Sequence, residues 1–290
     1  MDRPRRRGMR VRGSGKRVLN MNYSVLMSVY YKEKPEFLRQ SMESILAQTV
    51  VTDDFVLVCD GPLTTELDNV IASFQQRMGG ILHVVKLEKN GGLGNALNVG
   101  IKQCKNELVA RMDSDDIAHP DRCEKQLRVF QTSDVDIVSG TVEEFSVAPD
   151  TIDAKRVLPE THAEIIEFAK RRNPFNHPCV MYKKSVVEAA GGYQDMYLLE
   201  DYYLWLRMLQ NGSKGYNLQE PLLWMRGGSE MYKRRSGWKY AKAQRALFCY
   251  MKDKQFISFK QYIISCMVRT VSSCAPNWLR EGVFRVFLRE

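Results

Sequence analysis

The strongest constraint on the fold is a repeated alternation of short apolar runs with helical patterns that begins at residue 23. Runs that are apolar at nearly every position are typical of strands buried on both faces of a sheet. Helical segments of about 10–15 residues between such runs indicate βαβ units. The sequence therefore predicts an α/β domain with a mixed, mainly parallel sheet flanked by helices. The predicted strands are YSVLMSVYY (23–31), DFVLVCDG (54–61), LHVVKLE (82–88), ELVARMD (107–113) and DIVSG (136–140).

The rest of the chain is less regular. Residues 178–185 are predicted to form a strand, Gly191–Gly192 a turn, and residues 199–212, 238–253 and 258–274 helices. This divides the chain into a disordered basic tail (1–21), an α/β domain (22–225) and a basic helical extension (226–290). Two interpretations of the tail stay open: sequence upstream of a natural start at Met21, or a contact for anionic lipid.

Charge and cysteine content exclude several classes of protein. The net charge of +9 combines +7 in residues 1–20 and +10 in residues 226–290 with about −8 between them, which argues against a nucleic-acid binder. The seven cysteines are scattered without a CxxC pair, which favours reduced thiols in a cytoplasmic protein. No apolar run reaches the roughly 18–20 residues that a membrane-spanning helix needs.

Polar residues follow several predicted strands at the point where each strand ends. Glu33, Asp60, Asn90 and the cluster Asp113, Asp115 and Asp116 all have this position. Ligands of open parallel sheets bind at the carboxyl ends of the strands. We therefore expect these side chains to meet at one edge of the sheet, where they form a binding site.

The aspartate cluster has the spacing D-S-D-D-I, which departs from the calcium-loop pattern at Ile117 and Ala118. Two or three carboxylates at a strand end suit Mg²⁺ or Mn²⁺, which take their other ligands from water and phosphates. The alternative is that Asp115 or Asp116 caps the following helix. For Asp116 the choice between a ligand contact and a cap stays open.

Four further motifs are candidates for chemistry. The turn NGGLGN (90–95) either places phosphates at a helix N-terminus or only begins a helix. Glu200 and Asp201 either include a general base or complement a helix dipole. His177 lies between two prolines, which favours an exposed contact with a ligand. The fourth candidate is a basic group formed by Arg226, Lys233, Arg234 and Arg235. It either clamps a diphosphate or forms a solvated face.

Five motifs in order resemble inverting glycosyltransferases of family 2, which have the GT-A fold. They are SVLMSVYYKEKPEFLRQSMESILAQT, VLVCDGP, NGGLGNALNVGI, ELVARMDSDDIAHPDR and LLEDYYLWLRMLQNG. The resemblance covers residues 22–290 and is greatest to bacterial enzymes of capsule, exopolysaccharide and O-antigen synthesis, including amylovoran-type transferases. It implies a Rossmann-like nucleotide-diphospho-sugar fold with a C-terminal helical extension.

The resemblance also implies roles for individual residues. Asp113 matches a position near the ribose, and with Asp115 it ligates Mn²⁺ or Mg²⁺. Asp116 faces the donor sugar, and Asp201 of the Glu200–Asp201 pair is the catalytic base. The other positions matching donor contacts are Val29, Tyr30, Glu33, Asp60, Asn90, Gly92, Asn95, Ser114, His177, Arg234 and Arg235.

The implied reaction transfers a hexose or N-acetylhexosamine from a UDP-sugar to an oligosaccharide or polyprenyl-diphosphate-linked acceptor, which forms a β-linkage. The chain lacks the QxxRW motif of processive synthases, which favours a single addition. The apolar and basic C-terminal segment is compatible with peripheral contact at the cytoplasmic face of the inner membrane, or with packing against the domain. A sugar-phosphate nucleotidyltransferase, which would need a GxGTR loop after the first strand, and a non-catalytic nucleotide-sugar binder or scaffold are the alternatives.

Overall fold

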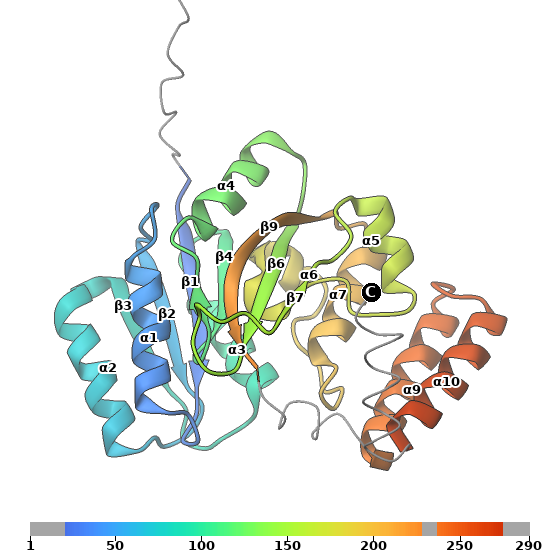
Figure 1. The fold of residues 1–290 in the computed structure, drawn as a ribbon, viewed down its shortest axis with the longest axis horizontal. Helices are drawn as coiled ribbons and strands as arrows, with labels where there is room; N and C mark the ends of the chain where they lie inside the picture. Colours follow the sequence, from blue (N-terminus) through green and yellow to red (C-terminus); the bar gives the residue numbers. More distant parts are fainter. Residues whose placement is uncertain (1–20, 228–236, 275–290) are drawn as a thin grey trace, which may run out of the picture.

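The computed structural model describes residues 21–227 and 237–274. Its centre is one curled sheet with the strand order β3-β2-β1-β4-β8-β6-β9-β5, and β7 pairs with β6 at the side (Figure 1). The first four strands in the chain are parallel, as the apolar runs predicted. These strands are β1 (Tyr23–Val29), β2 (Asp54–Cys59), β3 (Leu82–Lys86) and β4 (Leu108–Asp113).

The other half of the sheet is mixed. Strand β6 (Ile137–Phe145) runs antiparallel to β8 (Met181–Lys183) and parallel to β9 (Gly215–Arg226). The short strand β5 (Ile117–Ala118) pairs antiparallel with β9, and β7 (Ala154–Arg156) pairs with β6. Strand β9 was not predicted, because Pro221 argues against a strand interior. The structure places Pro221 at a register shift opposite Thr141, where the ladder is already interrupted.

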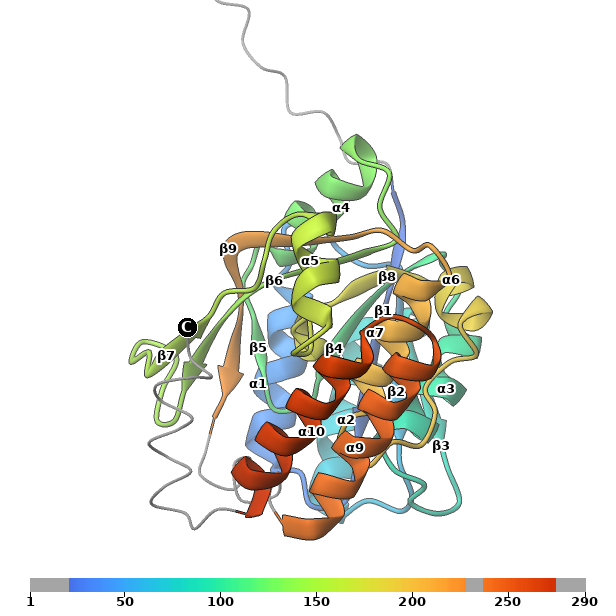
Figure 2. The same ribbon diagram turned by 90° about the vertical axis from the view of Figure 1, so that its right-hand side faces the viewer.

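Helices cover both faces of the sheet (Figure 1, Figure 2). One core joins the sheet to α1 (Pro35–Leu46), α2 (Thr65–Met78) and α4 (Arg122–Thr132). The opposite core joins it to α3 (Leu93–Gln103), α7 (Glu200–Gln210) and α9 (Gly237–Asp253). The sequence did not predict two short helices, α5 (His162–Ala169) and α6 (Lys184–Ala189). Turns of 3-10 helix occupy Gly79–Ile81 and His177–Cys179.

The C-terminal extension is helical, as predicted. Helix α9 inserts Leu247, Phe248 and Met251 into the core that also contains α7, and α10 (Phe259–Cys274) packs on the outside of α9. The predicted boundary at residue 225 lies one residue before the end of β9. Within residues 21–227 and 237–274, none of the helices has the length and apolarity needed to cross a bilayer.

Six of the seven cysteines are described as free thiols. Four are buried, at positions 59, 104, 123 and 179, and Cys249 and Cys266 are half-buried. Burial raises the pKa of the Cys59 thiol to about 11, so this group stays protonated at neutral pH.

Candidate active site

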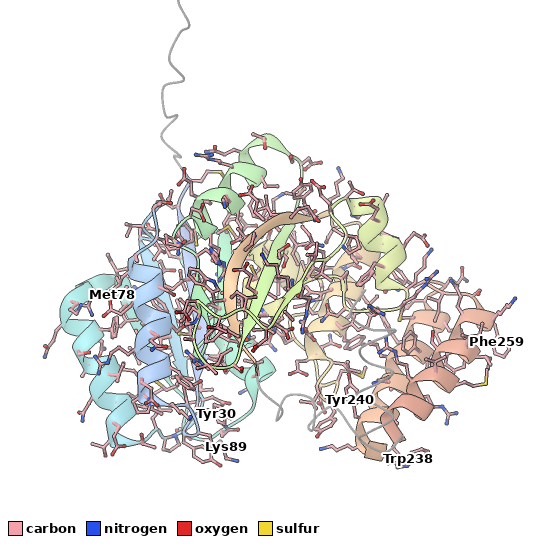
Figure 3. The ribbon with its side chains drawn as sticks, viewed as in Figure 1. Tyr30, Met78, Lys89, Trp238, Tyr240 and Phe259 are labelled. Carbon is pink, nitrogen blue, oxygen red and sulfur yellow. The ribbon has the colours of Figure 1, made fainter. Side chains whose placement is uncertain are left out.

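The carboxyl ends of β1, β2 and β4 lie side by side. Val29 is paired with Cys59, and Ser28 with Asp113, so the residues that follow these strands share one edge of the sheet. Tyr30 and Lys89, which follow β1 and β3, lie together at the lower edge of the molecule in Figure 3. This arrangement confirms the expectation that the polar strand ends meet, and it makes this edge the candidate site.

Asp113, Asp115 and Asp116 form a compact acidic cluster at the end of β4. One carboxylate oxygen from each lies within 4.8 Å of the others. Burial and the neighbouring Asp113 and Glu33 raise the pKa of Asp115 to about 7. The pKa of Asp116 is also raised, by burial and by Asp115, and its buried Oδ2 has no hydrogen-bond partner. Such unrelieved negative charge, together with a free buried oxygen, fits a divalent cation held by hard oxygen ligands.

The helix-cap alternative for these aspartates is wrong. Helix α4 begins at Arg122, and the position before it is occupied by Asp121. Asp115 and Asp116 instead precede strand β5, and Asp116 Oδ1 accepts a hydrogen bond from the backbone N–H of Arg226 (2.8 Å). The carboxylate of Asp116 is thus used to join the end of β9 to the acidic cluster.

Arg111 is a buried cation directly beneath the cluster. Its side chain is 0% exposed, and Nη2 donates to Asp113 Oδ1. The attached Nη1 and Nε have no hydrogen-bond partner. Asp113 is further held at its carbonyl oxygen, which accepts from Ser41 Oγ (2.9 Å). Arg111 was not singled out from the sequence, although an arginine within the apolar run of β4 was a visible signal.

Arg226 is bound to the turn of the acidic cluster. Its Nε donates to the carbonyl oxygen of Asp115 (3.1 Å), and Nη2 donates to Gln40 Oε1 (2.8 Å). The guanidinium lies 3.7 Å from the ring centre of Phe37 and 4.8 Å from that of Phe145. These contacts contradict the solvated-face alternative for Arg226, and the diphosphate clamp stays a prediction.

The glycine-rich turn is attached to the end of β2. Asp60 Oδ1 accepts from the N–H of Gly91 (2.7 Å), and Oδ2 accepts from that of Gly92 (3.0 Å). Asn90 Nδ2 donates to the carbonyl oxygen of Asp60 (3.1 Å). Gly61 follows at φ +86°, and a Cβ there would lie 2.6 Å from Asn90 N, so only glycine fits. Asp60 therefore orders the turn that begins α3.

Five other residues that were predicted to contact the donor belong to the same edge. Glu33 Oε2 accepts from Ser114 Oγ (2.6 Å), which connects the loop after β1 with the acidic cluster. Tyr30 is 38% exposed. Asn95 is exposed on the first turn of α3, whereas the side chain of Val29 is buried in the sheet.

Glu200 and Asp201 form the first turn of α7, as predicted. Asp201 Oδ2 accepts from Asn173 Nδ2 (2.6 Å), and Oδ1 accepts from the backbone N–H of Tyr202 (2.7 Å). Glu200 lies near the start of α3, since its Cγ is 4.0 Å from the Cβ position of Gly94. Asn173 was missed from the sequence, although it begins the motif that contains His177.

Tyr193 is a buried residue near the Glu200–Asp201 pair, because both Tyr193 and Glu200 lie beside the Cβ position of Gly94. Burial raises the pKa of the Tyr193 hydroxyl, and the charges of Arg111, Asp201 and Asp113 also act on it. Asn98 fixes its backbone with two hydrogen bonds of 2.7 Å. The sequence offered no signal for this position, because Tyr193 follows a glycine turn in an irregular segment.

His177 is half-buried rather than exposed, which corrects the sequence interpretation. Its Nε2 lies 2.9 Å from the Tyr193 hydroxyl, and its ring packs against Trp205. Burial and the nearby Arg111 lower its pKa well below the usual range. Arg234 and Arg235, like Lys233, lie outside the described residues.

The sequence is similar to characterised transferases over most of its length. The model of Glycosyl transferase family 2 matches residues 24–190. The chain is 38% identical to an Escherichia coli UDP-Gal:alpha-D-GlcNAc-diphosphoundecaprenol beta-1,3-galactosyltransferase, over 92% of this chain and 96% of the relative. It is 40% identical to the amylovoran biosynthesis glycosyltransferase AmsE of Erwinia amylovora, over 88% and 94%.

Two solved structures share the fold. TarS 1–349 of S. aureus in complex with UDP-GlcNAc matches with a TM-score of 0.66 and 16% identity, over 92% of this chain and 76% of that one. The chain spans about half (46%) of the longer TarS chain. The mannosyltransferase PcManGT of Pyrobaculum calidifontis, in complex with GDP-Man and Mn²⁺, matches with a TM-score of 0.61 and 13% identity, over 92% and 80%. These matches confirm the predicted GT-A fold.

Proposed function

The chain belongs to glycosyltransferase family 2, and from this membership we propose that it is an inverting transferase that uses a UDP-sugar. The donated group is a hexose or N-acetylhexosamine, and the acceptor is a saccharide carried on polyprenyl diphosphate. The product is a β-linkage in a bacterial surface polysaccharide. The named E. coli and Erwinia relatives, each of which this chain covers almost completely, support this assignment.

One observation carries the proposal. The acidic cluster after β4 and the carboxylate pair at the start of α7, about 85 residues apart in the chain, are each held by a dedicated partner: Arg111 binds Asp113, and Asn173 binds Asp201. A nucleotide-sugar transferase needs both groups, one at the diphosphate and one at the attacking hydroxyl. A binding module or scaffold needs no base held by a dedicated hydrogen bond such as that from Asn173.

Asp113, Asp115 and Asp116 would hold Mg²⁺ or Mn²⁺. Their oxygen ligands, their close spacing and the free Oδ2 of Asp116 fit such an ion. When bound, the ion supplies positive charge that stabilises the diphosphate as a leaving group. The remaining charge of the cluster is balanced by Arg111 from below.

Asp201 acts as the general base. Asn173 and the N–H of Tyr202 orient its carboxylate, so it can accept the proton of the acceptor hydroxyl. The hydroxyl oxygen forms a bond to the anomeric carbon while the bond from that carbon to the UDP oxygen breaks. Attack from the face opposite the leaving group inverts the configuration, so a UDP-α-sugar yields a β-glycoside. Asp60 and the glycine turn, with Glu33 and Tyr30, are proposed to contact the nucleoside.

A lipid-linked acceptor would place the enzyme at the cytoplasmic face of the plasma membrane, as a peripheral protein. The diphosphoundecaprenol in the name of the E. coli relative supports this location.

Release of UDP and formation of glycoside can be measured together with UDP-galactose or UDP-GlcNAc, Mn²⁺ and a short-chain lipid-diphosphate GlcNAc acceptor. We expect Asp201→Asn to lower kcat by roughly 10²–10⁴-fold while UDP-sugar binding persists. Asp115→Asn should weaken both Mn²⁺-dependent binding of UDP and turnover. Full turnover in both variants would overturn the mechanism. Incorporation of a sugar phosphate into a new UDP-sugar would instead indicate a nucleotidyltransferase.

A further inference from the structure

The outer surface of the α9–α10 pair carries an unusual number of exposed apolar side chains. Six of the twelve large hydrophobic side chains that are exposed in the described part of the chain belong to these two helices. We call five of them, which lie on α10 and are 38–68% exposed, the outer row: Phe259, Ile263, Ile264, Met267 and Val268. The spacing of these residues places them on one broad side of a helix.

The outer row faces away from the protein. Helix α10 is the outermost element of this flank in both ribbon views, and Phe259 projects from the outer edge of the molecule (Figures 1, 2 and 3). The inner side of α10 supplies Tyr262 and Cys266, which pack against the core shared with α7 and α9. The row is therefore not needed to attach α10, and an apolar surface of this kind indicates an interaction partner.

Exposed basic side chains lie on the same two helices as the outer row. Helices α9 and α10 with their connection contain seven lysines and arginines and a single acidic residue, Asp253. Lys239, Lys242 and Arg245 are exposed along α9, and Lys260 is exposed within the row. This charge differs in sign from that of residues 21–225, whose net charge is about −8.

We propose that the outer row and the exposed lysines of α9 and α10 form a docking surface for an anionic lipid bilayer. Apolar side chains of a basic amphipathic helix enter the interface between headgroups and acyl chains, and lysine and arginine contact the anionic headgroups. The proposal deepens the proposed function, on which it rests for the bilayer that carries the acceptor. Its physical basis is the combination of exposed apolar area with positive charge.

Charge also distinguishes the bilayer from other occupants. A second copy of the same surface would bring one net positive charge against another, because the pair of helices carries about +6. Residues 275–290 have three arginines against two glutamates, so they carry no net negative charge that would attract them to the lysines of the two helices. An anionic bilayer satisfies both features of the surface.

The position of the surface suits an acceptor embedded in the bilayer. Trp238, 63% exposed at the start of α9, lies at the same lower edge of the molecule as Tyr30 and Lys89 of the candidate site (Figure 3). Tryptophan is enriched at the interface between membrane and water. Docking through α10 and Trp238 would bring this edge next to lipid headgroups.

Vesicle co-sedimentation of the full chain tests the proposal. We expect binding to vesicles of phosphatidylcholine mixed with phosphatidylglycerol, weak binding to phosphatidylcholine alone, and release by salt. The variant Ile264→Gln/Met267→Gln should lower the partition coefficient at least about tenfold. Lys242→Gln should lower the partition coefficient only with the anionic vesicles. Lys102→Gln, on α3, is the control and should leave the partition coefficient unchanged.

The matched control is Val147→Gln/Val157→Gln. These two valines are 82% and 55% exposed and lie outside α9 and α10. The control variant should bind as the wild type does. Wild-type protein that stays in the supernatant with anionic vesicles would overturn the proposal. The same result is expected if residues 275–290 or a second copy of the chain covered the outer row. Equal binding by the row variant would also overturn it. Activity on the short-chain acceptor should be unchanged, so loss of vesicle binding is distinguishable from failure of the proposed transferase function.

Discussion

At the scale of single residues, the site depends on side chains that orient the acidic cluster without belonging to it. Arg226 holds the carbonyl of Asp115 through its side chain and the carboxylate of Asp116 through its N–H. Arg111 balances Asp113 from a fully buried position. Groups that orient metal ligands often matter nearly as much as the ligands themselves.

Arg226→Met tests this role. The variant keeps Phe37 and Phe145 covered but loses the bonds to Asp115 and Gln40, so the turn can move. We expect kcat/KM to fall about 10–100-fold and the Mn²⁺ concentration for half-maximal rate to rise. Arg77→Met, which breaks an exposed ion pair with Glu43 on α1, is the control and should leave both values unchanged. An unchanged Mn²⁺ requirement in Arg226→Met would contradict the role.

The pKa of His177 should make the free energy of unfolding depend on pH. Its pKa in the folded protein lies well below the ordinary 6.5, because burial and Arg111 disfavour the charged ring. Below pH 6.5 the unfolded chain therefore binds a proton that the folded protein does not, so stability falls as the pH falls. The slope contributed by this group is up to about 1.4 kcal/mol per pH unit.

Chemical denaturation between pH 7 and 5 measures this slope. The variant His177→Gln should show a flatter profile than the wild type. Tyr193→Phe retains the titrating ring and should retain the slope. If the stability of His177→Gln changed with pH as steeply as that of the wild type, another group would be responsible for the slope.

At the scale of elements, the glycine-rich turn is positioned by the packing of α3 on the sheet. Gly100 lies where a Cβ would meet Leu26 Cδ1 at 2.4 Å and Val58 Cγ2 at 2.8 Å. The helix can approach β1 and β2 this closely only without a side chain there. The turn at Gly91 and Gly92 is attached to the same helix and is held by Asp60.

Gly100→Ala should therefore destabilise the protein although alanine favours helices. We expect a loss of about 1–3 kcal/mol from overpacking, which exceeds the roughly 1 kcal/mol gained in helix propensity. KM for the UDP-sugar should rise because the turn shifts with α3. Gly80→Ala is the control, since nothing lies within 4 Å of its Cβ position. A stabilised Gly100→Ala variant would mean that α3 can move away at little cost.

At the scale of the whole molecule, the candidate site draws on loops from both halves of the sheet. Residues after β1, β2 and β4 meet the start of α7 and the end of β9. A ligand that contacts several of these segments binds the folded state alone and stabilises it.

UDP with Mn²⁺ should raise the melting temperature more than either alone. At free ligand about 100 times Kd, the expected gain is about 2.7 kcal/mol. Differential scanning fluorimetry of wild type and Asp115→Asn measures it, with Asp121→Asn as the control, since Asp121 is a half-buried aspartate directly before α4 and outside the acidic cluster. Equal shifts in Asp115→Asn and wild type would argue against a metal-bridged diphosphate.

Most of the parallel half of the sheet could be predicted from the sequence. The runs that became β1, β2 and β4 are largely apolar on both faces, and that local pattern is sufficient to identify buried strands. Strand β3 lies at the edge of the sheet and is buried only at Leu82. Strands β5 and β7 have two and three residues, which is too short for any periodicity. The acidic cluster and the Glu200–Asp201 pair were identified because both are local groupings of charge.

The sequence by itself determined which chemical groups are present and where strands and helices of strong periodicity occur, because both are properties of neighbouring residues. Only the tertiary structure decided which distant residues hold those groups in place. Arg226 reaches Asp116 across 110 residues, Asn173 reaches Asp201 across 28, and His177 meets Tyr193 across 16. Such contacts follow from strand order and helix packing, which no local pattern encodes. The same holds for α10, whose apolar residues suited burial equally well until the fold left them outside.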